Sequence, residues 1–359
     1  MLERDQLVDA YDFELPQELI AQEALAQRDA ARLMVVRHDE FQDRRFSELP
    51  DILRPDDILV LNETRVIPAR LFANRVTGGK VEVLLLHPAG GAYNLLARRW
   101  TALLRPAKRI RIGETLTFVG ASDNVSLGKA TLVAANDDGT RDVHLELDVP
   151  LEEFLQRDGR LPLPPYVRND SQEAQESYQT IFARVPGSVA APTAALHFTQ
   201  ELFTALKTRG IETAKLTLDV GLGTFRPMAS RLVDQHLMHS ERYALSREAV
   251  VRIERAKAAG RRVVAVGTTV VRALEGNVAE RGHLLAGEWT TSIFIKPGFR
   301  FRIVDAMITN FHLPRSTLLV LVSAFSGRER ILDAYRAAIQ RGYRFFSFGD
   351  AMFLTQRGV

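Results

Sequence analysis

The chain has 359 residues, of which 46% are hydrophobic, and its formal net charge is +3 at pH 7. This length favours about two domains, and the hydrophobic content is sufficient for a core in each. The chain contains no cysteine, which excludes disulfide bonds and thiolate chemistry. No apolar stretch approaches the ~20 residues of a membrane span, and no basic and apolar leader is present. We therefore expect a globular cytoplasmic protein that does not enter a membrane.

The first part of the chain combines helical and strand patterns. Residues Gln17–Gln27 follow a proline and have apolar residues at helical spacing, which predicts a short helix. Leu33–Arg37 and Ile58–Leu61 are compact apolar runs, which predict two buried strands of an α/β sheet. Polar residues follow the second strand directly.

From about Val66 to Pro150 the pattern changes to short alternating strands without a helical period. Strands are expected at Val81–Leu86, Ile110–Phe118, Ala130–Ala134 and Val143–Val149. A closed or nearly closed barrel would leave these strands without exposed edges. Because helices and strands alternate again afterwards, we expect a small all-β, barrel-like domain over 66–155. It would be inserted into a three-layer α/β domain made of 1–65 and 156–359.

The return to the larger domain is marked by Gly159–Tyr166 (GRLPLPPY), whose prolines forbid helix. This segment is either a stiff connector or a wall of the active cleft. Residues Gln200–Arg209 predict a helix that stops at Gly210.

The strand expected at Lys215–Val220 runs into a turn that contains Gly221, Gly223 and Thr224. Glycines allow the backbone to approach a ligand closely, and open α/β sheets bind ligands at such strand ends. A tight turn without any ligand would have the same glycines.

A strand–turn–helix unit follows. Ser246 is expected to cap a helix through Ala259, and Arg262–Val266 to form a strand. Gly267, Thr268 and Thr269 then precede a helix expected over Val270–Glu280. The free N–H groups at its start would bind an anion such as a carboxylate, or serve only to cap the helix.

Three more strands are expected, at Ile293–Ile295, Phe301–Val304 and Leu318–Val322. Ser326 and Glu329 have the spacing of a capping box and predict a final helix that ends near Arg341. The phenylalanines of segment 345–348 are expected to complete the sheet.

Six basic residues and no acidic residue occur between Arg98 and Arg111. Such a cluster on a β domain suits RNA phosphates, with Trp100 available to stack on a base. A solvated charged face is the alternative. The residues that we expect to bind phosphates are Arg105, Lys108, Arg109 and Arg111.

Three histidines lie in segments rich in small and polar residues, namely His197, His239 and His312. Each could titrate near neutral pH, or serve only a structural role. Because no pair has the spacing of a metal-binding helix, we expect no metal site.

Several longer segments carry a family resemblance. They are GSVAAPTAALHFT, LTLDVGLGTFRP, RVVAVGTTVVRALE, TNFHLPRSTLLVLVSAFSGRE and YRFFSFGDAM, with NETRVIPARL, TGGKVEVLLL, LLRPAKRI and GRLPLPPYV earlier in the chain. Together they resemble the S-adenosylmethionine:tRNA ribosyltransferase-isomerases of queuosine synthesis, almost from end to end. The chain departs from the pattern at four places. Asp219 replaces a usual histidine, Ala195 and Ala107 replace glycines, and Ala24 replaces a proline.

The resemblance implies an enzyme that consumes S-adenosylmethionine and uses no other cofactor. It would add the ribosyl moiety to 7-aminomethyl-7-deazaguanine at the wobble position of tRNA, releasing adenine and methionine and leaving epoxyqueuosine. Such a reaction needs a base for the carbon beside the sulfonium, an acid for adenine, and a site without water. A monomer is expected. A non-catalytic RNA-binding protein and an S-adenosylmethionine-dependent RNA methyltransferase are the alternatives.

The motif segments then suggest roles for particular residues. The residues expected to bind S-adenosylmethionine are Gly221, Gly223, Thr224, Gly267 and Thr268. The candidates for the base are His197 and His312, since a neutral imidazole is better matched to this proton than an ordinary carboxylate. Asn310 is expected to orient substrate hydroxyls, and Asp350 to pair with a cation. If neither histidine is the base, the next candidates are His239 and Glu241.

Overall fold

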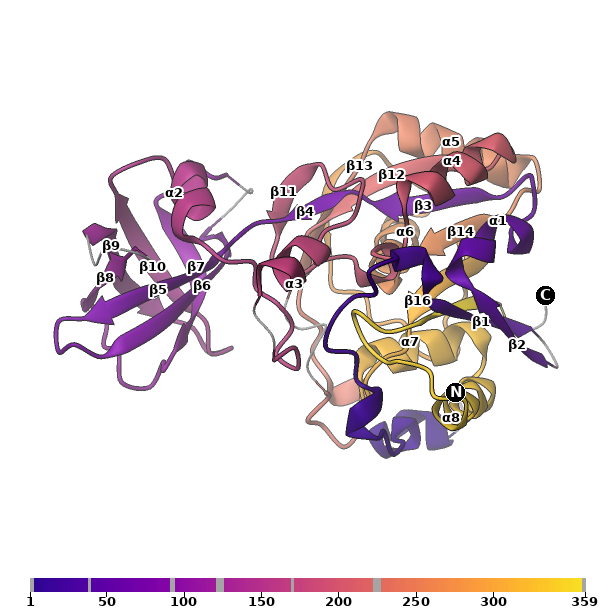
Figure 1. The fold of residues 1–359 in the computed structure, drawn as a ribbon, viewed down its shortest axis with the longest axis horizontal. Coiled ribbons are helices and arrows are strands. Elements are labelled where there is room, and N and C mark those ends of the chain that lie inside the picture. The colour runs from indigo at the N-terminus through magenta and orange to yellow at the C-terminus, as the bar shows by residue number, and fades with distance from the viewer. Residues whose placement is uncertain are drawn as a thin grey trace. The chain divides into compact units, whose positions relative to one another are not determined.

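The structure, a computed structural model, describes residues 3–37, 40–90, 94–120, 126–168, 171–221 and 227–356. The chain divides into two compact units (Figure 1). The first comprises Met1–Arg65, Pro164–Val185 and Ala191–Val359, and the second comprises Val66–Leu163 and Pro186–Ala190. The second unit is therefore inserted into the first along the chain.

Within the described residues, the first unit contains a nine-stranded mixed sheet in the order β15-β13-β12-β3-β14-β16-β17-β1-β2. Its strands are β1 (Arg32–Arg37), β2 (Glu40–Arg45), β3 (Ile58–Asn62), β12 (Glu212–Leu218), β13 (Glu241–Leu245), β14 (Val263–Val266), β15 (Gly287–Thr291), β16 (Ala306–Asn310) and β17 (Ala351–Thr355). Strands β12, β3, β14 and β16 run parallel to one another. Their carboxyl ends therefore meet at one edge of the sheet, where ligands bind in folds of this kind.

Burial explains the pattern of apolar and polar residues in these strands. Every residue of β3, β14 and β16 is buried, and continuous apolar runs are typical of parallel strands that are covered on both faces. The edge strand β2 is mostly exposed and carries charges such as Asp43 and Arg44, which discourage pairing with another chain.

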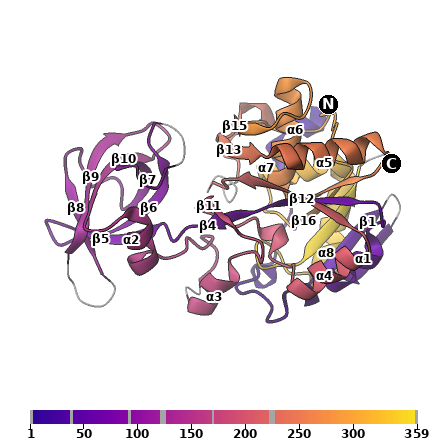
Figure 2. The same cartoon turned by 90° about the horizontal axis from the view of Figure 1, so that it is seen from above.

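The helices of this unit cover both faces of the sheet (Figure 2). They are α1 (Leu49–Ile52), α3 (Gln172–Ser177), α4 (Gln200–Thr208), α5 (Arg247–Ala258), α6 (Thr268–Arg281), α7 (Thr317–Ser326) and α8 (Arg328–Gln340). Helices α1 and α4 lie on one face, over a core that includes Leu59, Leu206 and Val264. Helices α5 and α6 lie on the other face. The expected three-layer α/β domain is confirmed.

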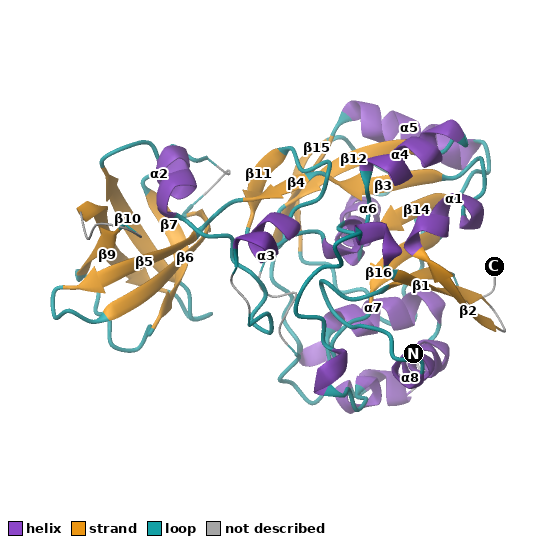
Figure 3. Cartoon of the chain, viewed as in Figure 1, coloured by secondary structure: helices purple, strands orange, loops and turns teal. Residues whose placement is uncertain are grey.

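The second unit is a closed barrel in the order β10-β7-β6-β5-β8-β9. Figure 3 draws its strands in orange, as it does those of the first unit. Its elements are β5 (Arg70–Arg75), β6 (Lys80–Pro88), β7 (Arg99–Arg105), β8 (Thr115–Val119), β9 (Ser126–Ala135), β10 (Arg141–Leu147) and α2 (Leu151–Asp158). Closure leaves no unpaired strand edge, and the expected inserted barrel is confirmed. Strands β4 (Thr64–Val66) and β11 (Val185–Ser188) pair with each other where the chain passes between the units.

The second unit continues past α2 to Leu163, beyond the boundary at 155 expected from the sequence. Gly159 shows how tightly the chain is packed there. A Cβ at this position would lie 1.9 Å from the carbonyl oxygen of Pro68 and 2.5 Å from that of Leu155. Only glycine fits at this approach of two backbone segments.

Two sequence predictions for the N-terminal and barrel segments were wrong in part. Residues Gln17–Gln27 contain only a 3₁₀ turn, Gln17–Leu19, because the chain continues in extended form and Ile20 bridges to Phe345. In the barrel, only the end of the expected strand Ile110–Phe118 forms β8, and β5 and β7 had no predicted counterpart.

The C-terminal predictions were wrong for a common reason, since short apolar runs do not distinguish a buried strand from a buried helix. Leu318–Val322 lies inside α7, and Ile293–Ile295 and Phe301–Val304 are loops beside β15 and β16. The phenylalanines of 345–348 also lie in a loop, and β17 takes the expected place in the sheet.

The capping box was also wrong. The Ser326 hydroxyl donates to the carbonyl oxygen of Thr355, and α8 begins after Gly327. The helix itself is confirmed. No helix among the described residues is both long and apolar enough to cross a membrane.

Glu275 of α6 fixes the segment that leads into β16. Its carboxylate accepts hydrogen bonds from the backbone N–H groups of Arg302, Ile303 and Val304, at 2.8–2.9 Å. The side chain is only 1% exposed, and this burial raises its pKa.

We predict that Glu275→Ala lowers the free energy of unfolding by about 3 kcal/mol, because it leaves three backbone donors, one buried and two partly buried, without an acceptor. Glu275→Gln keeps one acceptor oxygen and should cost less. Urea titration of both variants measures this, and an alanine variant as stable as the parent would contradict it.

Candidate active site

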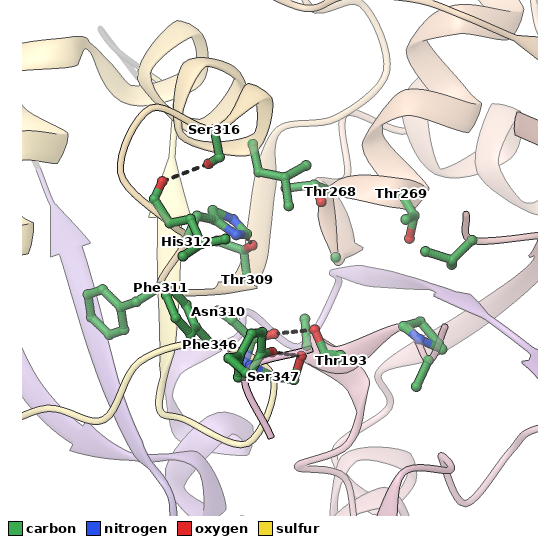
Figure 4. Close-up of a pocket in the computed structure, with 18 residues that line it drawn as sticks. Thr193, Thr268, Thr269, Thr309, Asn310, Phe311, His312, Ser316, Phe346 and Ser347 are labelled. Carbon is green, nitrogen blue, oxygen red and sulfur yellow. Dashed lines mark hydrogen bonds between the residues drawn. The ribbon is translucent and has the colours of Figure 1, made fainter. Parts of the chain in front are cut away.

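A pocket lies at the carboxyl ends of the parallel strands of the first unit (Figure 4). About 610 Å³ of space between its walls and at its mouth is free of protein atoms. Its walls are Tyr166, Ala191, Pro192, Thr193, Ala194, Val220, Gly267, Thr268, Thr269, Thr309, Asn310, Phe311, His312, Leu313, Ser316, Leu318, Phe346 and Ser347.

The described residues that line this pocket include no Asp, Glu, Lys or Arg. Hydroxyl groups, one amide and one imidazole supply the polar character of its walls. Small apolar side chains and aromatic rings make up the rest. The pocket is therefore suited to a ligand that is held by hydrogen bonds and apolar contact.

His312 is the second residue after β16 and lines the pocket. Its Nε2 lies 2.9 Å from the Thr309 hydroxyl, and no other described group is within hydrogen-bonding distance of the ring nitrogens. Its backbone N–H donates to the Tyr335 hydroxyl at 2.8 Å. Burial lowers the pKa of His312 to about 3, so the imidazole is neutral near pH 7. The expectation that it titrates near neutral pH was therefore wrong, and at this pKa it is a weaker base than an ordinary carboxylate.

Asn310, the last residue of β16, connects the pocket to His197. The Thr193 hydroxyl donates to Asn310 Oδ1 at 2.8 Å, and Asn310 Nδ2 lies 3.4 Å from His197 Nε2. His197 itself does not line the pocket, and its ring packs on Phe46. Burial, with a contribution from the Arg344 charge, lowers its pKa to about 4. The structure thus brings Asn310 and His312 into the pocket and places His197 behind them.

The N-terminus of α6 opens into the pocket through Gly267, Thr268 and Thr269. Gly267 has a φ of 95°, and no side chain caps this helix end. Gly221 follows Val220, which lines the pocket. Two further residues expected to bind S-adenosylmethionine, Gly223 and Thr224, lie outside the described residues.

Asp350 does not line the pocket. Its carboxylate accepts hydrogen bonds from the backbone N–H groups of Arg32 and Arg344, at 2.9 and 2.8 Å. No ion pair to a described side chain accompanies these bonds. Burial raises its pKa, and its hydrogen bond from Arg344 closes the loop 344–350.

The further candidates for the base, His239 and Glu241, do not line the pocket either. His239 is exposed, and Glu241 is buried in an ion pair with Arg272. Asp219 lies just beyond β12 with its carboxylate 3.7 Å from Arg242 Nε. Burial raises the pKa of Asp219 to about 6, although Arg242 opposes the shift. No group of three or more described His, Cys, Asp or Glu side chains could hold a metal ion.

The basic residues expected to bind RNA lie on the barrel unit. Arg105 ends β7, and Lys108, Arg109 and Arg111 occupy the following loop. All four are exposed. No ion pair within 4.0 Å joins their side chains to an acidic side chain of the described residues, although the Arg111 backbone N–H donates to the Glu114 carboxylate. The role expected for Trp100 was wrong, because its ring is fully buried and its Nε1–H donates to the carbonyl oxygen of Ala97.

Several wall residues were not singled out from the sequence, among them Tyr166, Thr193, Thr309 and Phe346. All lie in or beside segments that carry the family resemblance, which is the signal that could have found them. Tyr166 is the last residue of the proline-rich segment GRLPLPPY.

The fold and pocket define an α/β protein with a small-molecule site at its strand ends and an inserted β-barrel. A family model described as "Queuosine biosynthesis protein" matches residues 8–354. The chain belongs to this family.

Proteins of similar sequence match this chain over nearly its full length. The S-adenosylmethionine:tRNA ribosyltransferase-isomerase of Anaeromyxobacter sp. (strain Fw109-5) is 50% identical over 349 residues, which cover 96% of this chain and 98% of that protein. The protein of the same name from Thermus thermophilus is 50% identical over 352 residues, covering 97% and 99%. The crystal structure of S-adenosylmethionine tRNA ribosyltransferase from Thermotoga maritima is 36% identical, with a TM-score of 0.53, over 96% of this chain and 99% of that one.

The raised pKa of Asp219 predicts a pH-dependent stability. The folded state keeps the proton up to about pH 6, whereas the ordinary value is 3.8. Stability is therefore lost as pH rises between these values, by up to about 3 kcal/mol. The variant Asp219→Asn has no such titration. The free energy of unfolding of the variant minus that of the parent should therefore rise by up to about 3 kcal/mol as the pH rises over this range.

Urea titrations of both proteins at several pH values between about 4 and 7 measure this difference. A difference that stays constant with pH would show that the Asp219 carboxyl titrates normally.

Proposed function

We propose that this chain transfers and isomerises the ribosyl moiety of S-adenosylmethionine onto 7-aminomethyl-7-deazaguanine at the wobble position of tRNA. Adenine and methionine are released, and epoxyqueuosine-tRNA is formed. The full-length identity of about half to relatives named for this reaction carries the proposal. S-adenosylmethionine is consumed as a substrate without a further cofactor, and the chain acts as a cytoplasmic monomer.

The first chemical step removes a proton from the carbon beside the sulfonium. We assign His312 as the base, because it is neutral at physiological pH and lines the pocket. Thr309 engages one ring nitrogen and leaves the other for the substrate. Proton transfer creates an imidazolium beside a carbanion, and their attraction in a dry site raises the basicity of an otherwise weak base.

The other pocket groups bind and orient S-adenosylmethionine. The uncapped N-terminus of α6, at Gly267 and Thr268, suits the methionine carboxylate, because its free N–H groups and dipole favour an anion. Asn310, held by Thr193, is placed to orient ribose hydroxyls, with His197 supporting it from behind. Three more residues are assigned to S-adenosylmethionine binding from the sequence alone, namely Gly221, Gly223 and Thr224.

The tRNA is bound in part by the exposed basic residues of the barrel. Each phosphate contact with an unpaired Lys or Arg releases counterions and adds affinity. The four residues proposed for this role are Arg105, Lys108, Arg109 and Arg111, all of which are exposed.

Product analysis tests the reaction. Adenine released only when S-adenosylmethionine and precursor tRNA are both present is the expected result. Methylated RNA would show a methyltransferase instead, and RNA binding without turnover would show a binding protein.

We predict that His312→Ala lowers adenine release by at least about 100-fold, the usual contribution of a general base. In deuterated water this variant should also lose deuterium uptake at the carbon beside sulfur. His197→Ala should retain more of both activities, because it acts through Asn310. An unchanged rate for His312→Ala, with unchanged affinity for S-adenosylmethionine, would exclude His312 as the base.

We predict that replacing Arg105, Lys108, Arg109 and Arg111 with glutamine weakens tRNA binding and leaves the affinity for S-adenosylmethionine unchanged. The slope of log affinity against log salt should fall by roughly one unit for each phosphate that the variant no longer neutralises. The matched control neutralises four exposed basic residues of the other unit, Lys207, Arg247, Arg255 and Arg336. Equal tRNA affinity and salt slope in the two quadruple variants would refute the assignment.

A further inference from the structure

Phe346 has a backbone conformation that a bulky residue rarely adopts. Its φ is 74°, in the left-handed region that favours glycine. The side chain is 6% exposed and lines the pocket. A strained residue in a pocket wall is often retained because its side chain has to be at that place.

The surrounding loop holds Phe346 in this conformation. Its N–H donates to the carbonyl oxygen of Phe311 at 3.2 Å, and its carbonyl oxygen accepts from Gly349 N at 3.0 Å. Asp350 closes the loop, because its carboxylate accepts from Arg344 N and its own N–H donates to Arg344 O at 2.8 Å. A Cβ at Gly349 would lie 2.5 Å from Arg344 O, so this tight loop has no room for a side chain at position 349.

A second aromatic ring lies beside Phe346. The Tyr166 ring centroid is 4.7 Å from that of Phe346, with 48° between the planes. Its hydroxyl donates to Ser347 Oγ and accepts from Ser347 N at 3.0 Å. Figure 4 shows Phe346 and Ser347 beside Thr193 and Asn310, apart from the α6 threonines.

We propose that Phe346, together with Tyr166, forms the subsite for the adenine ring of S-adenosylmethionine. This inference rests on the proposed function. A purine has two apolar faces, and aromatic side chains bind nucleic-acid bases by stacking on such faces. The α6 N-terminus, apart from this pair, suits the carboxylate, so the ribose lies between them near Asn310 and His312. Asp350 is then a positioning residue that holds Phe346 in place.

The test is calorimetric titration with S-adenosylmethionine in the absence of tRNA. Phe346→Leu removes the aromatic plane and should weaken binding by about 5- to 150-fold, the loss of one stacked base. Phe346→Tyr keeps the plane and should bind normally. The matched control is Phe345→Leu, which makes the same change at a fully buried neighbour that does not line the pocket.

Parental affinity in Phe346→Leu would overturn the inference, and so would an equal loss in Phe345→Leu. If Phe346→Leu does not fold, Tyr166→Leu removes the second ring and is judged by the same fold-change. These outcomes leave the proposed function standing. Failure of the parent to bind S-adenosylmethionine at all would refute the proposed function and this inference together.

Discussion

Desolvation of an uncharged pocket is the constraint on which the rest of the site depends. His312 lies in a wall whose described residues include no Asp, Glu, Lys or Arg, and burial alone lowers its pKa from 6.5 to about 3. A carboxylate side chain at the position of His312, away from the N–H groups of the α6 N-terminus, would take up a proton rather than remain charged. A neutral imidazole can remain there and still accept a proton when the reaction itself supplies a compensating charge.

Two buried carboxylates of this unit lie away from the pocket, and both have several hydrogen-bond donors. Asp57 accepts two hydrogen bonds from Arg262, at 2.8 and 2.6 Å, and Glu275 accepts three from the backbone before β16. These contacts fix β14 and β16, which carry the pocket residues at their ends. A site built on such strands is held more rigidly than one built on surface loops.

Periodicity predicted the parts of the fold in which local pattern and tertiary environment agree. The strand–turn–helix unit around Gly267 and the inserted barrel were predicted because glycines, caps and alternation mark them directly. The strand expected at Leu318–Val322 was wrong, because a helix that is buried on all sides leaves the same apolar run as a strand. For the site, motif segments indicated Asn310 and His312. Neither the hydrogen bond between Thr309 and His312 nor the conformation of Phe346 has a signal in local sequence, since both depend on the folded backbone.

The most direct test of the uncharged pocket is a nitrogen-15 NMR titration of the histidine side chains, with His312 assigned by comparison with His312→Gln. We predict that His312 remains neutral, with one protonated ring nitrogen, from about pH 5 to pH 8. A titration of His312 with a midpoint near its ordinary value of 6.5 would contradict an uncharged, desolvated site.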